Sequence, residues 1–260
     1  MLSIPFVAGS PNWIDLATPD LAGANTFYGG LFGWTFRSAG PQFGGYGMYM
    51  QDGKAVGAAM EMPAEQAKPS WSVYFHAVDS EATVKAVEAA GGASMFGPHD
   101  VAALGRMSGF TDVTGARFST WQPEEHKGLD EVNAPGTFCW AELYTTDVPA
   151  SAAFYRAVFG WDTNSAPYPG GTYTMASPAG TGPEANFAGF VQTGADSPDG
   201  CYWLPYFEVD DVDATVARAK QLGGSVVMEP VDLPGVGRLA KATDPYGAQF
   251  ALIKDADAGA

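Results

Sequence analysis

The chain has 260 residues, 46% of them hydrophobic and 13% aromatic, so it can bury a core and is not a disordered chain. Acidic residues number 29 against 13 lysines and arginines, and the formal net charge of −16 argues against nucleic-acid or anionic-membrane binding. Two cysteines, Cys139 and Cys201, are too few for a disulfide framework. Since no apolar run approaches the ~20 residues that span a membrane, and no secretory signal is recognisable, we expect a cytoplasmic protein.

The first predicted element is a strand at residues 11–17, which opens a repeat of one strand, one helix and three strands. Thr18 and Pro19 are typical of a helix cap and a first helical residue, and Gly33 is typical of a helix end. Asp52-Gly53 predicts a hairpin turn between the last two strands. The three strands after the helix are expected at residues 34–38, 45–51 and 55–62.

The second repeat follows the same plan. It is predicted to contain a strand at residues 71–78, a helix at 80–90 that ends at Gly91-Gly92, and strands near 93–96, 106–111 and 116–122. Residues 124–137 combine charges with proline and glycine, which is typical of a linker. The expected domains are therefore residues 1–123 and 138–260.

The second half of the chain repeats the first. WIDLATPDLAGANTFYGGLFGW, which begins at Trp13, matches WAELYTTDVPASAAFYRAVFGW, which begins 127 residues later at Trp140. WSVYFHAVDSEATVKAVEAAGG from Trp71 matches WLPYFEVDDVDATVARAKQLGG from Trp203, 132 residues later. The difference between the two offsets predicts an insertion between them, around Pro178 to Pro183. The βαβββ plan thus occurs four times.

These motifs resemble the vicinal-oxygen-chelate superfamily, which includes glyoxalase I, bleomycin-resistance proteins and extradiol dioxygenases. The resemblance rests on D-L-x-x-A-x-x-F-Y-x-x-L-F-G-W after the first strand, closely repeated in the second half, and on D-P-x-G-x-x-F at Asp244–Phe250 with a variant at Asp112–Phe118. It implies an α+β fold in which four βαβββ repeats form two tandem glyoxalase/bleomycin-resistance-like domains with curved mixed sheets. The tandem form is also similar to actinobacterial proteins labelled as hydroxylases or linked to antibiotic biosynthesis.

The resemblance also implies where metal ligands would lie: on the first strand of each repeat, and four residues after the glycine of D-P-x-G. The residues at these positions are Trp13, Trp140, Ser72, Leu204, Ser119 and Ala251. Tryptophan, leucine and alanine cannot coordinate a divalent ion, and serine seldom does so unaided. Glu61 lies near the remaining position, but one glutamate does not make a site. We therefore expect no metal and no cofactor.

In this fold the same positions face the concave side of the sheet, as does every second residue along each strand. The expected ligand-binding residues are Trp13, Tyr46, Met48, Ser72, Tyr74, Trp140, Tyr206 and Glu208. Asp15, Glu142 and His76 are the candidates for a catalytic acid or base. Two structural interpretations remain open: the repeated acids could pair with Arg106 and Arg238, and the two tryptophans could be core residues.

Aromatic clefts without metal ligands favour a protein that binds or sequesters an aromatic small molecule, such as an antibiotic or a pathway intermediate. The bleomycin-resistance branch binds its ligand in this way, and we expect a monomer or a homodimer. The alternative is a metal-independent enzyme, such as an isomerase, a cyclase or a helper in oxygenation, that uses Asp15 or Glu142 as its base. The substituted ligand positions argue against a metal-dependent glyoxalase or dioxygenase.

Overall fold

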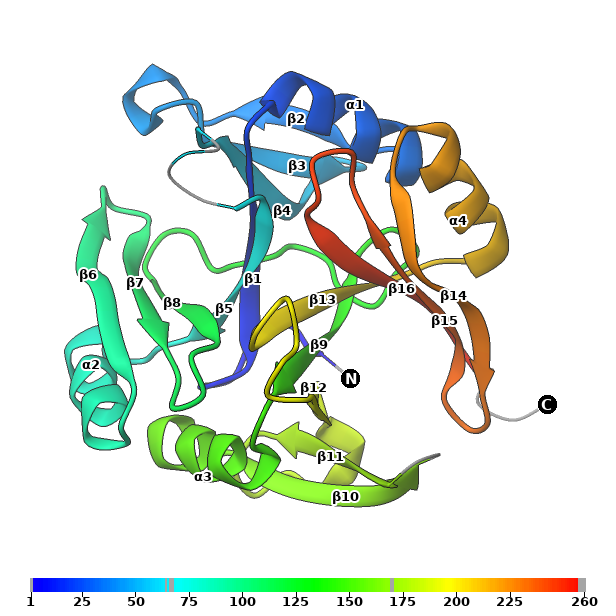
Figure 1. The fold of residues 1–260 in the computed structure, drawn as a ribbon. Coiled ribbons are helices and arrows are strands. Elements are labelled where there is room, and N and C mark those ends of the chain that lie inside the picture. Colours follow the sequence, from blue (N-terminus) through cyan, green and yellow to red (C-terminus); the bar gives the residue numbers. More distant parts are fainter. Residues whose placement is uncertain (1, 64, 66–67, 169–170, 257–260) are drawn as a thin grey trace. The chain divides into compact units, whose positions relative to one another are not determined.

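The computed structural model describes the whole chain except residues 1, 64, 66–67, 169–170 and 257–260 (Figure 1). The first half contains β1 (Pro11–Thr18), α1 (Leu21–Phe32), β2 (Thr35–Ser38), η1 (Pro41–Phe43), β3 (Gly47–Gln51), β4 (Lys54–Glu61), β5 (Ser70–His76), α2 (Ser80–Ala89), β6 (Ala93–Val101), β7 (Gly105–Thr111) and β8 (Arg117–Pro123). The second half contains β9 (Phe138–Thr145), α3 (Val148–Phe159), β10 (Asp162–Tyr168), β11 (Gly171–Ser177), η2 (Pro183–Ala185), β12 (Ala188–Gln192), β13 (Tyr202–Glu208), α4 (Val212–Gln221), β14 (Ser225–Leu233), β15 (Gly237–Thr243) and β16 (Gln249–Asp255).

The four βαβββ repeats and the α+β class are confirmed. Each half forms one eight-stranded sheet, with the strand orders β2-β3-β4-β1-β5-β8-β7-β6 and β10-β11-β12-β9-β13-β16-β15-β14. The first strand of each repeat pairs in parallel with the last strand of the same repeat. The remaining pairs within a repeat are antiparallel, so both sheets are mixed.

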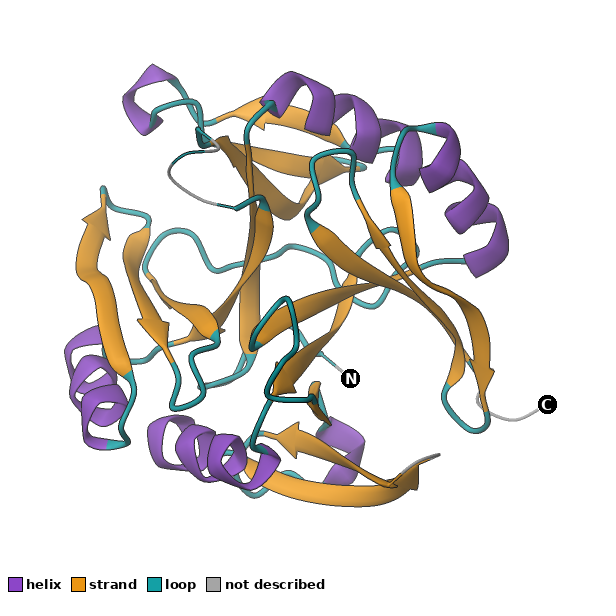
Figure 2. Cartoon of the chain, in the orientation of Figure 1, coloured by secondary structure: helices purple, strands orange, loops and turns teal. Residues whose placement is uncertain are grey.

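Contacts between Cα atoms divide the chain into two compact units, and each unit takes one repeat from each half. Unit 1 comprises Met1–Trp13, Ser72–Gly128 and Trp140–Leu204, and unit 2 comprises Ile14–Trp71, Leu129–Cys139 and Pro205–Ala260. Within unit 1, α2 lies beside α3, and within unit 2, α1 lies beside α4 (Figure 2). The domain limits at residues 1–123 and 138–260 describe the repeat along the sequence and stay a prediction.

The first helix begins later than the sequence suggests. Thr18 is still part of β1, and Asp20 is the cap: its backbone is extended, with φ −141°, and its carboxylate accepts the Gly23 N–H at 2.9 Å. A carboxylate satisfies this free donor and also interacts favourably with the positive end of the helix dipole. The helix ends as predicted, because Gly33 has a left-handed φ of 76° and its repeat partner Gly160 has 75°.

A buried hydrogen-bond network fixes α1 in unit 2. The Tyr28 hydroxyl donates to Asp244 Oδ2 at 3.3 Å and accepts from Trp71 Nε1 at 3.0 Å, while Asp244 Oδ1 accepts the backbone N–H groups of Tyr246 and Ala248. Tyr28 is 0% exposed, so each of these polar groups depends on the others for a partner. Helix α1 of the first half is thereby bound to a loop of the second half.

Unit 1 contains the equivalent network, in which the tyrosine and the tryptophan come from the second half and the aspartate from the first. Tyr155 donates to Asp112 Oδ2 at 3.0 Å and accepts from Trp203 Nε1 at 2.8 Å. Asp112 is 4% exposed, and its Oδ1 accepts the backbone N–H of Ala116. We call these two sets the Tyr–Asp–Trp networks.

Residues 124–137, predicted as a linker, contain no helix or strand. The segment is nevertheless held in place: Asp130 Oδ2 accepts the Ala55 N–H at 2.8 Å, Glu131 forms an ion pair with Lys54 at 2.8 Å, and Leu129 is 3% exposed. A buried apolar anchor with a backbone hydrogen bond beside it fixes a segment without regular structure.

Candidate functional site

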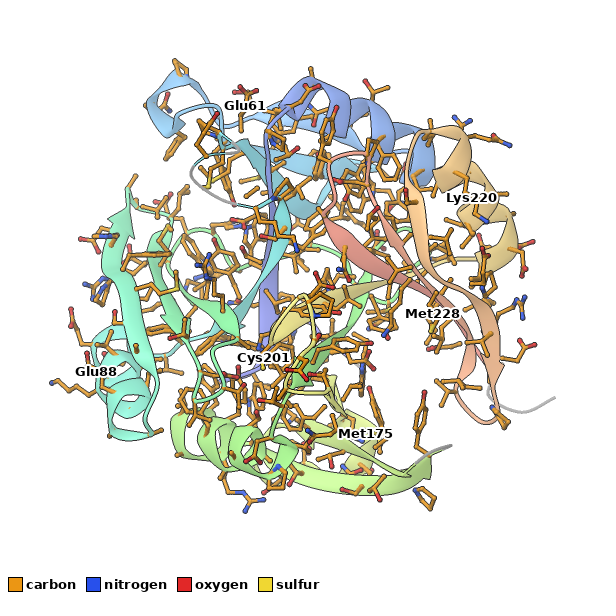
Figure 3. The ribbon with its side chains drawn as sticks, in the orientation of Figure 1. Glu61, Glu88, Met175, Cys201, Lys220 and Met228 are labelled. Atoms are coloured by element: carbon orange, nitrogen blue, oxygen red, sulfur yellow. The ribbon has the colours of Figure 1, made fainter. Side chains whose placement is uncertain are left out.

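A row of four residues on neighbouring strands crosses one sheet face in unit 1. In the strand register, Asn164 of β10 pairs with Met175 of β11, Met175 with Gly189 of β12, and Gly189 with Glu142 of β9. Paired residues on neighbouring strands point to the same face, so the four positions form a line, which we call the second-half row. Met175, which is labelled in Figure 3, is half-buried at its centre, and Glu142 is 7% exposed at its inner end.

Unit 2 has the equivalent line, which we call the first-half row. Arg37 of β2 pairs with Met48 of β3, Met48 with Ala58 of β4, and Ala58 with Asp15 of β1. Asp15 is 6% exposed, Met48 is half-buried and Arg37 is exposed. Each row therefore runs from a polar outer residue over a methionine and a small residue to a buried acid.

Aromatic side chains surround the acid of the second-half row. Tyr173 donates a hydrogen bond to Glu142 Oε1 at 2.9 Å, Tyr144 donates to Glu142 Oε2, and Trp140 Nε1 donates to the Tyr173 hydroxyl at 3.2 Å. Tyr202 stacks on Tyr144 with ring centroids 4.8 Å apart. We call these five residues the Glu142 network. Burial, and secondarily the charge of Glu142, raises the pKa of Tyr173 well above its usual range, so this phenol remains a donor.

A glycine lets Tyr173 reach the acid. A Cβ atom at Gly189 would lie 1.8 Å from the Tyr173 hydroxyl oxygen, so the phenol ring can cross β12 only where no side chain stands. In the first-half row Ala58 holds the equivalent place, and the hydroxyl of Tyr46 lies 3.4 Å from Asp15 Oδ2. The same acid–tyrosine pair therefore occurs in both halves, with the closer contact in the second.

The two repeated arginines have acidic partners other than the two row acids. Arg106 forms ion pairs with Asp100 at 2.8 Å and with Glu81 at 3.2 Å. Arg238 pairs with Asp232 at 3.0 Å and with Asp213. The structural interpretation in which these arginines pair with Asp15 and Glu142 is therefore wrong. The two acids have tyrosine partners instead, and hydrogen bonds from tyrosines also satisfy a buried carboxylate.

The two repeated tryptophans differ in exposure. Trp13 is 3% exposed and packs edge-on against the His126 ring, with centroids 4.5 Å apart, so it has the surroundings of a core residue and not of a stacking platform. Trp140 is half-buried and belongs to the Glu142 network. Of this pair, Trp140 has the more exposed ring, and its role as a ligand-binding residue stays a prediction.

Three expected site residues lie on β5 in unit 1. Ser72 and His76 are half-buried, and Tyr74 is 7% exposed and pairs in register with Ser119. Nδ1 of His76 lies 3.2 Å from the Phe6 carbonyl oxygen, and burial lowers the pKa of the imidazole. This environment favours a neutral histidine with a structural hydrogen bond.

The remaining two lie on β13 in unit 2. Tyr206 is 4% exposed, and its carbonyl oxygen is 3.4 Å from Cys139 Sγ. Glu208 is 8% exposed, and burial together with the nearby charge of Asp255 raises its pKa to about 7. Glu208 is therefore an acid that exchanges its proton near neutrality.

The structure thus brings together Trp140 with Glu142, and Asp15 with Tyr46 and Met48. Sequence reasoning missed three members of the Glu142 network, Tyr173, Tyr144 and Tyr202, although the repeat carried a signal for Tyr173. Tyr173 lies 127 residues after Tyr46, the same offset that relates Trp140 to Trp13.

The donor atoms do not fit the divalent metal that the resemblance implies. The indoles of Trp13 and Trp140 stand at two of the expected positions, and Ser119 is paired in register with Tyr74. Among the residues that the structure describes, no three His, Cys, Asp or Glu side chains cluster closely enough to hold a metal ion.

A groove of about 430 Å³ lies elsewhere in unit 2, between the end of α1 and the start of α4. Phe32, Gln51, Pro135, Asp211 and Arg218 are among its lining residues, and none of the expected site residues contributes to it. It is shallow and open, so the chemistry of the rows is the better guide to function. Within the described part of the chain, no helix combines the length and the apolar character needed to cross a membrane.

The chain is similar over nearly its whole length to several bacterial proteins. It is 38% identical to the anthracycline biosynthesis protein DauV of Streptomyces sp. strain C5, covering 96% of this chain and 94% of DauV. It is 39% identical to the anthracycline biosynthesis protein DnrV of Streptomyces peucetius, covering 96% and 94%. It is also 39% identical to CFP32 of Mycobacterium tuberculosis, which is named as a candidate glyoxylase, covering 95% of each chain.

Among solved structures, the 2,2',3-trihydroxybiphenyl 1,2-dioxygenase of Sphingomonas wittichii superposes with a TM-score of 0.67 at 14% identity, covering 95% of this chain and 91% of that one. At this identity the likeness shows the fold alone. Residues 10–120 and 137–252 each match the family model described as Glyoxalase/Bleomycin resistance protein/Dioxygenase superfamily. Two successive matches, together with the four βαβββ repeats, mean that the chain belongs to the glyoxalase/bleomycin resistance protein/dioxygenase superfamily.

Proposed function

We propose that this protein binds a planar aromatic small molecule of antibiotic biosynthesis at the Glu142 network, without a divalent metal. The observation that carries the proposal is the arrangement of the half-buried rings of Trp140, Tyr173 and Tyr202 around the buried Glu142 carboxylate. Aromatic faces supply stacking area for a flat ligand, and a small number of fixed polar atoms orient it.

The relatives support the chemical class of the ligand. DauV and DnrV are both named for anthracycline biosynthesis, and anthracyclines contain fused planar rings. Each alignment covers 96% of this chain and 94% of the relative, so both halves of the chain have a counterpart in DauV and in DnrV. We therefore take a fused aromatic molecule, either an intermediate or a finished antibiotic, as the ligand class.

The hydrogen bonds of Glu142 favour binding over catalysis by this acid. Both carboxylate oxygens accept from phenols, Oε1 from Tyr173 and Oε2 from Tyr144. A general base needs an oxygen directed at the substrate proton, whereas here the carboxylate orders two aromatic rings. The alternative, a metal-independent enzyme, requires that contact with the ligand rearrange one of these bonds.

The test compares Trp140→Phe with its repeat-matched control, Trp13→Phe. The probe is the neutral molecule anthraquinone-2-carboxamide, and the readout is quenching of tryptophan fluorescence. We expect saturable quenching of the wild type, a roughly fivefold weaker affinity for Trp140→Phe, and unchanged affinity for Trp13→Phe, since aromatic pairs contribute about 0.5–1.5 kcal/mol beyond the buried area.

Absence of saturable quenching, or equal losses in the two variants, would contradict the proposal. Chromatography of the same mixtures separates binding from turnover: the probe should be recovered unchanged. If the protein converts a ring ligand into a product, the enzyme alternative replaces the binding function.

A further inference from the structure

The outer ends of the two rows differ in charge. Arg37 of the first-half row is exposed, with its guanidinium 3.8 Å from Met48 Sδ, and it forms no ion pair with any other residue that the structure describes. At the equivalent place in the second-half row, Asn164 is neutral and exchanges hydrogen bonds with Asn186 at 2.8 and 3.3 Å. One row ends in a cation and the other in an amide pair.

The connection between the third and fourth strands of the repeat also differs between the halves. In the second half β11 and β12 are joined by residues 178–187, which include η2 and supply Asn186 to the row. In the first half β3 and β4 are joined only by Asp52-Gly53, both with positive φ, as the hairpin pattern predicts. The first-half row therefore has no equivalent of Asn186 at its outer end, and its guanidinium faces solvent.

An exposed guanidinium has a definite chemical preference. It presents a planar set of donors that matches a carboxylate in two parallel hydrogen bonds. The formal net charge of this chain is −16, so most of its surface repels anions. A cation beside an apolar surface is therefore a place where an anionic ligand is favoured over a neutral one. Met48, half-buried beside Arg37, supplies a polarisable surface that adapts to an aromatic ring.

The row also sets a minimum length for the ligand. Arg37 and Asp15 are separated by three strand spacings, or about 14 Å between Cα atoms at about 4.8 Å per spacing. A single ring bound to Arg37 would cover Met48 and stop short of the Asp15–Tyr46 pair, whereas fused rings can extend over Ala58 toward that pair.

We propose that the first-half row is a second binding site, selective for a fused aromatic molecule that carries a carboxylate, with the carboxylate on Arg37 and the rings over Met48. The ring class rests on the proposed function, but the charge selectivity is a separate property of Arg37. The protein then has two sites with different ligand charges, one in each half.

The experiment uses the intact protein with 13C-labelled methionine methyl groups. Met48 and Met175 report on the first-half and second-half rows separately, and Met48→Leu and Met175→Leu assign their NMR signals. Anthraquinone-2-carboxylate and its carboxamide are titrated into wild type, Arg37→Gln and the control Arg156→Gln, which removes one exposed arginine of unit 1 that bonds Thr163.

We expect the carboxylate to shift the Met48 signal at about fivefold lower concentration than the amide, the size of a partly exposed ion pair of about 1 kcal/mol. Arg37→Gln should remove this preference, and Arg156→Gln should keep it. Equal response of Met48 to both probes, or equal losses in both arginine variants, overturns the inference.

The two methionines separate the two proposals. If Met175 responds to the amide while Met48 shows no preference for the carboxylate, the proposed function stands and this inference fails. If Met175 responds to neither probe while Met48 selects the carboxylate through Arg37, the inference stands and the proposed Glu142 site fails. If neither signal moves, both are wrong.

Discussion

Substitution of Gly189 by alanine tests whether Tyr173 lies across β12. The backbone of Gly189 is not among the residues with positive φ, so alanine is sterically acceptable to the main chain. The obstacle is the phenol: the new Cβ would lie 1.8 Å from the hydroxyl oxygen and 2.2 Å from Cζ. Such distances are far below van der Waals contact, so Tyr173 must move away from Glu142.

The magnitude follows from the bonds that Tyr173 would give up. A hydrogen bond to a charged group contributes about 1.5–3 kcal/mol, and Tyr173 also loses the weaker bond from Trp140. Alanine in place of glycine within a strand stabilises the folded state by about 0.5–1 kcal/mol, because the unfolded chain loses less backbone entropy on folding. The net result is a loss of about 1–2 kcal/mol in the free energy of unfolding for Gly189→Ala.

Urea unfolding of Gly189→Ala is measured both in the wild type and in a Tyr173→Ala background. The comparison tests the sign of the change in the free energy of unfolding and does not depend on its absolute size. In a Tyr173→Ala background both the clash and the hydrogen bonds are absent, so Gly189→Ala should stabilise by about 0.5–1 kcal/mol. The sign should therefore reverse between backgrounds. The control is Ala58→Gly in the first-half row, which should cost about 0.5–1 kcal/mol. A stabilising Gly189→Ala in wild type would refute the placement of Tyr173 over Gly189.

Two further changes test the core and the pH dependence. Tyr155→Phe leaves Asp112 and the Trp203 indole without their buried partner and should cost about 2–4 kcal/mol in urea unfolding, whereas the exposed control Tyr168→Phe should cost less than about 0.5 kcal/mol. The pKa of Glu208 is about 7, above its ordinary 4.5, so the folded state holds this proton more tightly; its stabilisation is complete at low pH and is lost as pH rises from about 4.5 to about 7. Glu208→Gln should flatten the fall in the urea midpoint across that window, and an unchanged slope would contradict the assigned pKa.

The fold was predictable because it depends on patterns that the chain repeats. Two gapless internal matches located the four βαβββ repeats. Strand alternation predicted that Asp15 and Glu142 lie on equivalent faces of the two sheets. The helix start was less predictable, because Thr18 and Asp20 are both good caps by residue type. The strand continues through Thr18, and only the structure shows that Asp20 meets the Gly23 N–H.

The candidate site was predictable only in part, because exposure depends on neighbours that lie outside the repeat. Trp13 and Trp140 occupy the same repeat position, yet His126, from the segment that links the halves, covers Trp13. In the same way, Asn186 comes from the long connection between β11 and β12, residues 178–187, and pairs with Asn164. A sequence pattern gives the face on which a side chain lies, but the neighbour across that face comes from tertiary structure.

The two rows provide an internal comparison of what duplication retained and what it changed. The acid and the methionine are common to both rows, and each acid has a tyrosine partner. The small residue is Ala58 in one row and Gly189 in the other, and the outer residue is Arg37 in one and Asn164 in the other. In the second-half row both differences lead to internal hydrogen bonds: glycine admits Tyr173 to the acid, and the amide finds Asn186. In the first-half row the corresponding changes leave a cation directed outward. This difference in charge at the outer ends is the feature on which the proposal of two sites with different ligand charges rests.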